Sequence, residues 1–439
     1  MEKEIKRQLD ILSSGALEVL PGDGLKAKIA VSLKENRPLI VKLGVDPTAP
    51  DLHLGHAVPL RKLRQFQDLG HKAVLIIGDF TALVGDPSGR SATRPPLTPE
   101  QVKINAKTYT DQAFKVLDDN PQRLEIRYNS KWLGSFSFET ILKLTARFTV
   151  AGLLVRDDFM KRYKAEQPIG LHEFLYPVMQ AYDSVEIRAD IELGGSDQKF
   201  NLLAGRQLQE KFEQEPQVAL TLPLLEGTDG VRKMSKSYDN HIGLTFEPAD
   251  MFGKVMRVPD EGPEQPRFSL ILKYYQLALG YLPDKVAAIA ADLEAEKLDP
   301  RDAKEELAWQ VVATYQGREA ADAARADFDA RFRRPRLQTV HADTERIVTR
   351  MPAVEISVES NIEREALKED GTIWVPKLLV LTGGAQSTSE GRRLIEQSGV
   401  RFKGELITDP ATEVKIEGGE ILQIGKRKVY KLTLLPINS

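Results

Sequence analysis

One stretch, residues 39–69, constrains the fold more than any other part of the chain. It opens with an apolar run at 39–43 that only Lys42 interrupts, the pattern of a strand buried on both faces. The loop at 44–50 follows, and its glycine and two prolines continue neither a strand nor a helix. From residue 54 onward apolar residues recur at helical spacing. The sequence therefore predicts a strand, a tight loop and a helix.

Two histidines, His53 and His56, fall in the first turn of that helix, with Gly55 between them. A helix N-terminus offers unpaired backbone N–H groups and the positive end of the dipole, so it favours a phosphate. Gly55 lacks a Cβ, which lets a ligand lie against the backbone. The spacing alone leaves two other interpretations open: a surface pair without a role, and two ligands of a metal site.

Length and composition restrict the class of protein. A chain of 439 residues with 41% hydrophobic and 28% charged residues is typical of a soluble enzyme of roughly two to four domains. The absence of cysteine excludes disulfides and thiolate metal sites and fits a cytoplasmic location. No apolar run is long enough to span a membrane, and the charged N-terminus is unlike a secretory signal.

Alternating elements predict an α/β fold. Further strands are expected at 72–77, 124–128, 189–193 and 218–222, separated by helices, which indicates a Rossmann-like parallel sheet with right-handed crossovers. Residues 1–20 are predicted to form one amphipathic helix. Ligands of such sheets bind at the carboxyl ends of the strands.

Four regions are expected along the chain. Residues 1–240 are predicted to form the Rossmann-like catalytic domain, with a helical insertion at about 130–165. Residues 241–340 lack strand patterns and predict a helical domain, and 341–370 predict a linker. Residues 371–439 predict a small α+β domain with ten Lys and Arg against seven Asp and Glu, a mildly basic tail on an acidic body.

Several motifs together carry a resemblance. HLGH at 53–56 and KMSKS at 233–237 flank the predicted sheet, in an order and spacing that resemble the class I aminoacyl-tRNA synthetases. Within that class DPTAPDLHLGH, GDPSG, YPVMQAYD and GGSDQ are similar to the bacterial tyrosyl enzymes. The tail segment at 387–407 resembles a small RNA-binding fold first known from a ribosomal protein. The resemblance covers almost the whole chain, and only about 337–370 match poorly.

The resemblance implies a tyrosine–tRNA ligase, which activates L-tyrosine with ATP and then transfers the tyrosyl group to the 3′-terminal ribose of tRNA(Tyr). Asp183 would accept a hydrogen bond from the substrate phenol, and Gln198 would face its carboxylate. The substrate ammonium would be bound by Asp86, Tyr176 and Gln180.

Lys42 departs from the family, because many members carry a tyrosine here that binds the phenol. We assign Lys42 to the tyrosine pocket and leave its contact open: the phenol oxygen, Asp183, or solvent at the end of a strand.

The resemblance also implies the ATP site. Thr48, His53 and His56 would stabilise the phosphates in the transition state, and Lys233 and Lys236 would bind the pyrophosphate from a mobile loop. The expected ATP and adenylate contacts are Gly44, Asp46, His53, Gly55, His56, Gly194, Asp197, Lys233, Met234, Ser235, Lys236 and Ser237, with added charge from Arg90 and Arg94. Mg²⁺ would arrive with ATP, and no protein-bound metal is expected.

Macromolecular partners follow from the same family. tRNA phosphates are expected to contact the basic tail, and a homodimer is expected through the helical insertion. The tail candidates are Arg392, Arg393, Arg401, Lys403, Lys426, Arg427 and Lys428, each of which is otherwise part of a solvated basic face.

Three alternative functions were weighed. An RNA-binding protein that has lost catalysis would have damaged motifs, and none is damaged. A nucleotidyltransferase that does not act on tRNA would lack the lysine loop and the tail, and both are present. A tryptophanyl enzyme would not be expected to carry Gln180 and Asp183.

Overall fold

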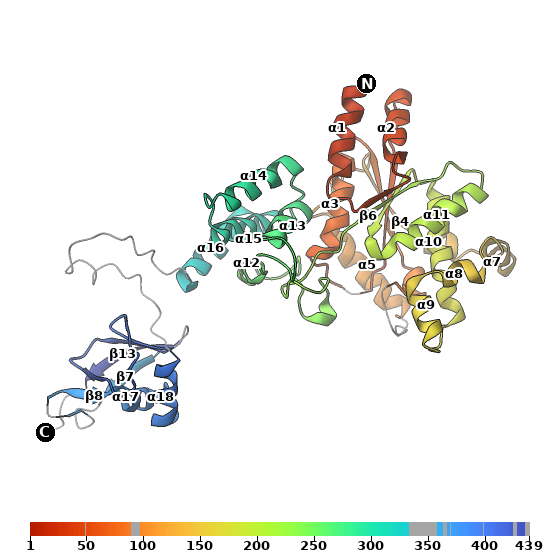
Figure 1. Ribbon diagram of the computed structural model, residues 1–439. Coiled ribbons are helices and arrows are strands. Elements are labelled where there is room, and N and C mark those ends of the chain that lie inside the picture. Colours follow the sequence, from red (N-terminus) through yellow and green to blue (C-terminus); the bar gives the residue numbers. More distant parts are fainter. Residues whose placement is uncertain are drawn as a thin grey trace. The chain divides into compact units, whose positions relative to one another are not determined.

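The computed structural model describes residues 1–48, 50–88, 97–332, 358–362, 367–368, 370–397, 399–424 and 428–434. The chain divides into two compact units, Met1–Asp329 and Ala330–Ser439 (Figure 1). The first unit contains both the predicted catalytic domain and most of the predicted helical domain. Each unit is described by itself below.

A six-stranded sheet forms the centre of the first unit, in the order β1-β6-β5-β2-β3-β4. Five strands are parallel, and only β1 runs antiparallel, against β6. This arrangement confirms the predicted α/β fold with a Rossmann-like parallel sheet. The strands are β1 (Glu18–Leu20), β2 (Ile40–Val45), β3 (Lys72–Ile77), β4 (Leu124–Tyr128), β5 (Ile191–Gly195) and β6 (Val218–Leu222).

Helices cover both faces of this sheet, since alternate strand residues point to opposite sides. Val41, Leu43 and Leu75 pack in the core on the face of α1, α2, α3 and α5, whereas Val74 and Ile76 pack on the other face with residues of α6 and α10. The helices up to β6 are α1 (Glu2–Ser13), α2 (Gly24–Glu35), α3 (Leu54–Asp68), α4 (Thr81–Val84), α5 (Pro99–Ala113), α6 (Ser130–Leu133), α7 (Phe138–Thr145), α8 (Val150–Leu154), α9 (Asp157–Lys164), η1 (Leu171–Phe174), α10 (Leu175–Ile187), η2 (Ser196–Gln198) and α11 (Lys199–Lys211).

The helical region after β6 shares the same hydrophobic core. Met251, Tyr274 and Val311 belong to one buried cluster with the strand residues of the sheet. Tyr315 extends this contact, because its hydroxyl accepts a hydrogen bond from Arg61 of α3 (3.4 Å). The elements are η3 (Lys236–Tyr238), α12 (Pro248–Arg257), α13 (Ser269–Leu277), α14 (Pro283–Glu294), α15 (Pro300–Gln316) and α16 (Arg318–Phe332).

The N-terminal segment differs from the prediction. The expected helix over residues 1–20 is wrong beyond Ser13, where α1 ends, and Gly15 then takes a φ of +70°. Residues 18–20 form β1, because their backbone pairs with β6 at the edge of the sheet.

The second unit contains a five-stranded sheet in the order β10-β9-β12-β13-β7 and a two-stranded sheet, β11-β8. β7 lies within the range predicted as a linker, yet it pairs in parallel with β13. The elements are β7 (Val358–Ile362), β8 (Thr372–Trp374), α17 (Val375–Leu381), α18 (Thr388–Glu396), β9 (Val400–Phe402), β10 (Glu405–Leu406), β11 (Glu413–Lys415), β12 (Ile421–Ile424) and β13 (Lys428–Leu434).

Candidate active site

The two histidines lie where the sequence predicts, at the start of α3. His53 is the N-cap residue in extended conformation, and its backbone N–H donates to His56 Nδ1 (3.2 Å). That contact makes Nδ1 of His56 an acceptor, so the neutral ring carries its proton on Nε2. Burial, followed by nearby positive groups, lowers the pKa of His53 to about 2 and that of His56 to about 4. At neutral pH both rings are therefore uncharged hydrogen-bond partners.

Backbone pairing brings the lysine motif to the histidine motif. The N–H of Leu54 donates to Ile242 O (3.0 Å), and the N–H of Leu244 donates to Leu52 O (2.9 Å). The segment that follows KMSKS is therefore fixed against the segment that contains HLGH. The structure thus joins two motifs that are about 180 residues apart in the sequence.

The lysine loop, residues 226–237, is held by a buried side chain and by hydrogen bonds to Asn240. Met234 is buried, and Asn240 accepts from the backbone N–H of Ser235 (2.8 Å) while its amide donates to Asp229 Oδ2 (3.0 Å). The two lysines of the loop each pair with an acidic residue. Lys233 Nζ lies 3.1 Å from Asp197 Oδ2, and Lys236 Nζ lies 3.3 Å from Asp51 Oδ2.

Asp46, at the carboxyl end of β2, is half-buried and accepts hydrogen bonds from two hydroxyl groups. Thr81 Oγ1 donates to Oδ1 and the Tyr176 hydroxyl donates to Oδ2, both at 2.8 Å. Gly78 makes this approach possible, since a Cβ there would fall 2.1 Å from Asp46 Oδ1. Burial raises the pKa of Asp46 to about 7, in spite of the two hydrogen bonds, and Asp86 adds to the rise.

Asp183 is a buried carboxylate on α10. Trp132 Nε1 donates to its Oδ1 (2.9 Å), and Asn129 Nδ2 donates to its Oδ2 (3.3 Å). Burial raises the pKa of Asp183 to about 7, while the charge of Lys42 opposes the rise. Sequence reasoning missed Asn129 and Trp132, although Asn129 directly follows β4, where the carboxyl-end rule could have indicated it.

Asp86 and Gln198 lie in one ring of hydrogen bonds that the sequence did not predict. Gln198 Nε2 donates to Asp86 Oδ2 (2.7 Å), and Asn201 Nδ2 donates to Gln198 Oε1 (2.9 Å). Buried Arg156 closes the ring, because it donates to Asn201 Oδ1 (3.1 Å) and pairs with Asp86 Oδ1 (3.3 Å). Arg156 comes from the turn between α8 and α9, and no local pattern marks it.

Lys42 is buried in the middle of β2. Its Nζ pairs with Glu192 Oε1 of β5 (2.9 Å) and donates to Ser184 Oγ (2.7 Å) and to the backbone oxygen of Gln180 (2.9 Å). The lysine is 0% exposed, which contradicts the option that it reaches solvent. Its ion-pair partner is Glu192 and not Asp183.

The structure describes some of the remaining predicted site residues and not others. The N–H of Thr48 donates to Asp46 O (2.8 Å), and Ser235 Oγ lies 2.9 Å from Ser237 Oγ. Gly44 is exposed and is the next-to-last residue of β2. A Cβ at Gly55 would approach the His53 ring to 3.0 Å, and one at Gly194 would approach Leu202 to 2.9 Å, so neither position has room for a side chain. Arg90, Arg94, Lys426 and Arg427 lie outside the described residues.

In the second unit four of the tail candidates are exposed: Arg392, Arg393, Arg401 and Lys403. The Arg392 guanidinium stacks 4.9 Å from the Trp374 ring centroid, and Arg401 donates to Gly404 O (3.2 Å). Lys403 Nζ lies 3.6 Å from Glu420 Oε1, and Arg393 lies on α18. Lys428 begins β13.

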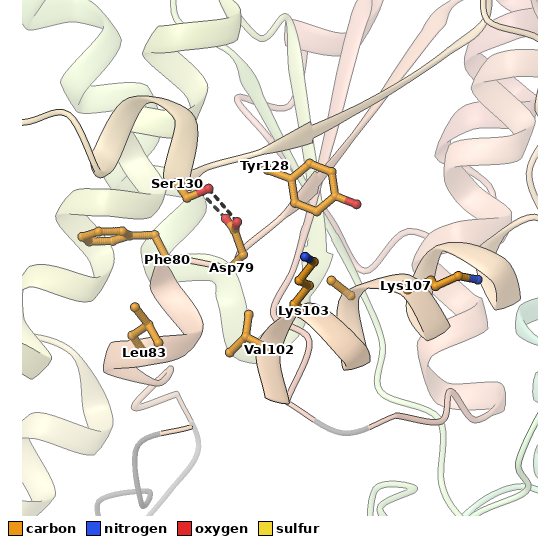
Figure 2. Close-up of a pocket in the computed structure, with 9 residues that line it drawn as sticks. Asp79, Phe80, Leu83, Val102, Lys103, Lys107, Tyr128 and Ser130 are labelled. Carbon is orange, nitrogen blue, oxygen red and sulfur yellow. Dashed lines mark hydrogen bonds between the residues drawn. The ribbon is translucent and has the colours of Figure 1, made fainter. Parts of the chain in front are cut away.

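A separate cavity of about 530 Å³ lies beside this site (Figure 2). Its walls come from α4, α5 and the ends of β3 and β4, and none of the predicted site residues lines it. In Figure 2 the Asp79 carboxylate, on its wall, is bound twice by Ser130, through the backbone N–H (2.9 Å) and the hydroxyl (2.6 Å). The lining residues are Asp79, Phe80, Leu83, Val102, Lys103, Ala106, Lys107, Tyr128 and Ser130.

The described residues contain no helix that could cross a membrane. Within the same ranges, no three His, Asp or Glu side chains are placed so that they could hold a metal ion together.

Comparisons with known proteins agree with the geometry. The model of the class I tRNA synthetases (W and Y) matches residues 34–333. The chain is 48% identical to the tyrosine–tRNA ligase of Moorella thermoacetica, over 98% of this chain and 97% of the relative. It is 46% identical to the tyrosine–tRNA ligase of Thermotoga maritima, over 98% of both chains.

A solved structure supports the fold. The tyrosyl-tRNA synthetase of Archaeoglobus fulgidus, crystallised with L-tyrosine, aligns with a TM-score of 0.59 at 22% identity. The alignment covers 73% of this chain and 99% of that one. At 22% identity this structural similarity supports the fold alone.

Proposed function

The chain belongs to the tyrosine–tRNA ligases of the class I synthetase family, and we propose how its described residues divide the work of that enzyme. The reaction has two steps. A carboxylate oxygen of L-tyrosine attacks the α-phosphorus of ATP, the bond to the β-phosphate oxygen breaks, and pyrophosphate leaves. A hydroxyl of the 3′-terminal ribose of tRNA(Tyr) then attacks the tyrosyl carbonyl carbon, and AMP leaves.

Recognition of the phenol is assigned to Asp183. Its two oxygens already accept from Trp132 and Asn129, and a carboxylate has lone pairs for a further donor. The carboxylate is buried, so phenylalanine would leave it without the hydrogen bond that offsets its desolvation. Sites built to bind a hydroxyl in this way reject the analogue that lacks it by about 10⁴–10⁵-fold, a range for which tyrosyl enzymes are themselves the reference case.

The substrate ammonium is assigned to Asp86, Tyr176 and Gln180. The Tyr176 hydroxyl donates its hydrogen bond to Asp46, so the lone pairs of its oxygen are left to accept from the ammonium. Asp86 supplies the negative charge, and Arg156 and Gln198 hold that carboxylate in place. Gln198 lies next to Asp86, which supports its assignment to the substrate carboxylate.

Phosphate binding is divided between neutral and charged donors. His53 and His56 are uncharged at neutral pH, so they contribute hydrogen bonds, while Lys233 and Lys236 contribute the positive charge. Thr48, Gly44, Asp46, Gly55, Gly194 and Asp197 complete the nucleotide site, with Met234, Ser235 and Ser237 of the lysine loop. The lysines would leave Asp197 and Asp51 when ATP, with its Mg²⁺, presents the stronger charge. The observation that carries this proposal is the backbone pairing that sets the lysine motif beside the histidine motif.

A homodimer is supported by the surface of the helical insertion. Several large apolar side chains of this region are exposed, which is unusual for a surface that remains in water. We call this set the insertion patch: Phe138, Leu142, Val150, Val155 and Tyr163 of the insertion, and Leu171 of η1 just after it. A second copy of the chain is the proposed partner of this patch.

We propose that the basic residues of the tail bind tRNA; they include Arg392, Arg393, Arg401 and Lys403. The proposed location of the protein is the cytoplasm.

Exchange of labelled pyrophosphate into ATP tests these assignments, with each of the twenty amino acids in turn. Exchange with tyrosine, reduced by orders of magnitude in Lys233→Ala, is the expected result. Exchange with tryptophan in place of tyrosine would contradict the roles of Asp183 and Gln180. Unchanged exchange in Lys233→Ala would contradict the role of the lysine loop.

A further inference from the structure

A cluster of polar side chains lies buried beneath the proposed tyrosine pocket. Lys42 of β2, Ser184 of α10, Glu192 of β5 and Gln217 are each 0% exposed. Gly205 of α11 closes over the cluster, because a Cβ there would fall 2.6 Å from Gln217 Nε2 and 3.1 Å from Glu192 Oε2. The cluster has no part in the roles proposed above.

Its two charges are fully bonded to protein groups. Lys42 Nζ has three acceptors, namely Glu192 Oε1, Ser184 Oγ and the backbone oxygen of Gln180. Glu192 accepts from Lys42 and Gln180 at Oε1, and from Ser184 and Gln217 at Oε2. A buried ion pair contributes little net stability, because desolvation of both groups offsets their attraction. Stability therefore does not explain why this ion pair is buried here, and we look for a functional role.

The contact with Gln180 indicates that role. Gln180 Nε2 donates to Glu192 Oε1 (3.1 Å), and an ionised carboxylate can only accept hydrogen bonds. The amide therefore has one orientation in which nitrogen faces Glu192, and its carbonyl oxygen is left for other partners. Lys42 holds the same residue through its backbone oxygen (2.9 Å). Gln180 is thus fixed at both its main chain and its side chain.

We propose that Glu192, with its charge balanced by Lys42, is a positioning residue that keeps the carbonyl oxygen of Gln180 directed to the α-ammonium of the substrate. The inference rests on the proposed function of Gln180. The buried pair then acts on specificity, because it favours substrates that carry an α-ammonium over analogues that lack one. It gives Lys42 a role in the tyrosine pocket that needs no contact with the phenol.

The test compares two ligands of the full-length protein by calorimetry: L-tyrosine and 3-(4-hydroxyphenyl)propanoate, which is tyrosine without its amino group. The variant is K42M/E192L, which removes both charges and so leaves neither one buried alone. We expect the preference for tyrosine over the analogue to fall about ten- to hundredfold, the range of a hydrogen bond to a charged group. K42M/E192Q is the second variant for the case that the first double variant does not fold, because it also removes both charges but keeps an acceptor for the Gln180 amide. Its neutral acceptor should give a smaller loss in the same direction.

Two further variants make the result decisive. S184A disturbs the same cluster but leaves the contact between Glu192 and Gln180 intact, so the preference should stay unchanged. In a Q180A background K42M/E192L should have no further effect on the preference. The inference is overturned if affinity for both ligands falls equally, if S184A has the same effect, or if the effect persists without Gln180. If Q180A alone leaves the preference unchanged, the proposed role of Gln180 is wrong instead.

Discussion

Two carboxyl groups of the site, those of Asp46 and Asp183, have pKa values near 7 because desolvation disfavours their charged forms. Hydrogen bonds from Thr81, Tyr176 and Trp132 favour the charged forms, yet they offset the burial only in part. Both groups therefore change protonation near neutral pH. A carboxylate in such a position gains most from a substrate that brings a further donor.

The pH dependence of specificity follows from Asp183. Below pH 7 the acid form predominates and no longer accepts from the phenol as a carboxylate, so kcat/KM for tyrosine should fall with acidity. Phenylalanine makes no such contact, so the ratio of kcat/KM for tyrosine to that for phenylalanine should fall as well. Pyrophosphate exchange between pH 5.5 and 8.5 measures both. Protonation of Asp46 would affect both amino acids alike, so a ratio that is constant over this range would contradict the assignment of Asp183.

Some site residues could be predicted from the sequence and others could not. Asp86, Gln180 and Asp183 stand in motifs, so the resemblance identified them together with their neighbours. Arg156 and Glu192 have no local signal, because each meets its partner only after distant elements pack: Arg156 lies 70 residues from Asp86, and Glu192 lies on the strand beside Lys42.

Among the secondary-structure elements, β3, β4 and β6 match their predicted ranges, because each is a continuous apolar or alternating run bounded by polar residues, glycine or proline. β1 was missed, since its three residues form a strand only through pairing with β6, and local periodicity carries no information about that partner.

Helix α3 also holds the end of α1 in place. Lys62 Nζ, on α3, donates to the backbone oxygens of Leu12 (3.1 Å) and Ser14 (2.6 Å), which end α1 without partners of their own in the helix. Lys62 is buried, and burial lowers its pKa to about 7.

Replacement of this lysine should loosen α1. We expect Lys62→Met to lower the free energy of unfolding by about 1–3 kcal/mol, because buried carbonyl oxygens lose their donor. Thermal unfolding and amide exchange over α1 measure the effect, and exposed Lys26→Met is the matched control. Between pH 7 and 10 the unfolded chain binds more protons at Lys62 than the folded one, so the stability of the native protein should rise with pH. A Lys62→Met variant that keeps this rise would contradict the interpretation.

At the scale of the whole protein, the proposed role of the insertion patch as a dimer interface predicts the oligomeric state. Val155→Asp should weaken self-association, since it places a charge in a buried apolar interface. Sedimentation velocity gives the oligomeric state. Val231→Asp changes an equally apolar and exposed residue outside the patch and should leave that state unchanged. Equal behaviour of the two variants would argue against the patch as the interface.

The two units predict a separation of the two reaction steps. A chain that ends at residue 332 keeps the entire hydrophobic core of the first unit, so pyrophosphate exchange with tyrosine should remain within about twofold of the full chain. Charging of tRNA(Tyr) should fall by orders of magnitude, because the proposed contacts between the tail and tRNA phosphates are lost. Loss of exchange in the truncated chain would show that activation needs the tail.

The pairing of Lys42 with Glu192 has a practical consequence for anyone who wishes to redesign this pocket for an unnatural amino acid. A library that randomises position 42 alone would leave a buried carboxylate without its counter-ion, at a cost of about 3–5 kcal/mol. Most of its members would be lost as unfolded protein before their selectivity could be measured. Positions 42 and 192 should therefore be varied together. Gln180 should be kept, because its proposed contact with the substrate ammonium shows whether the pocket is still correctly arranged.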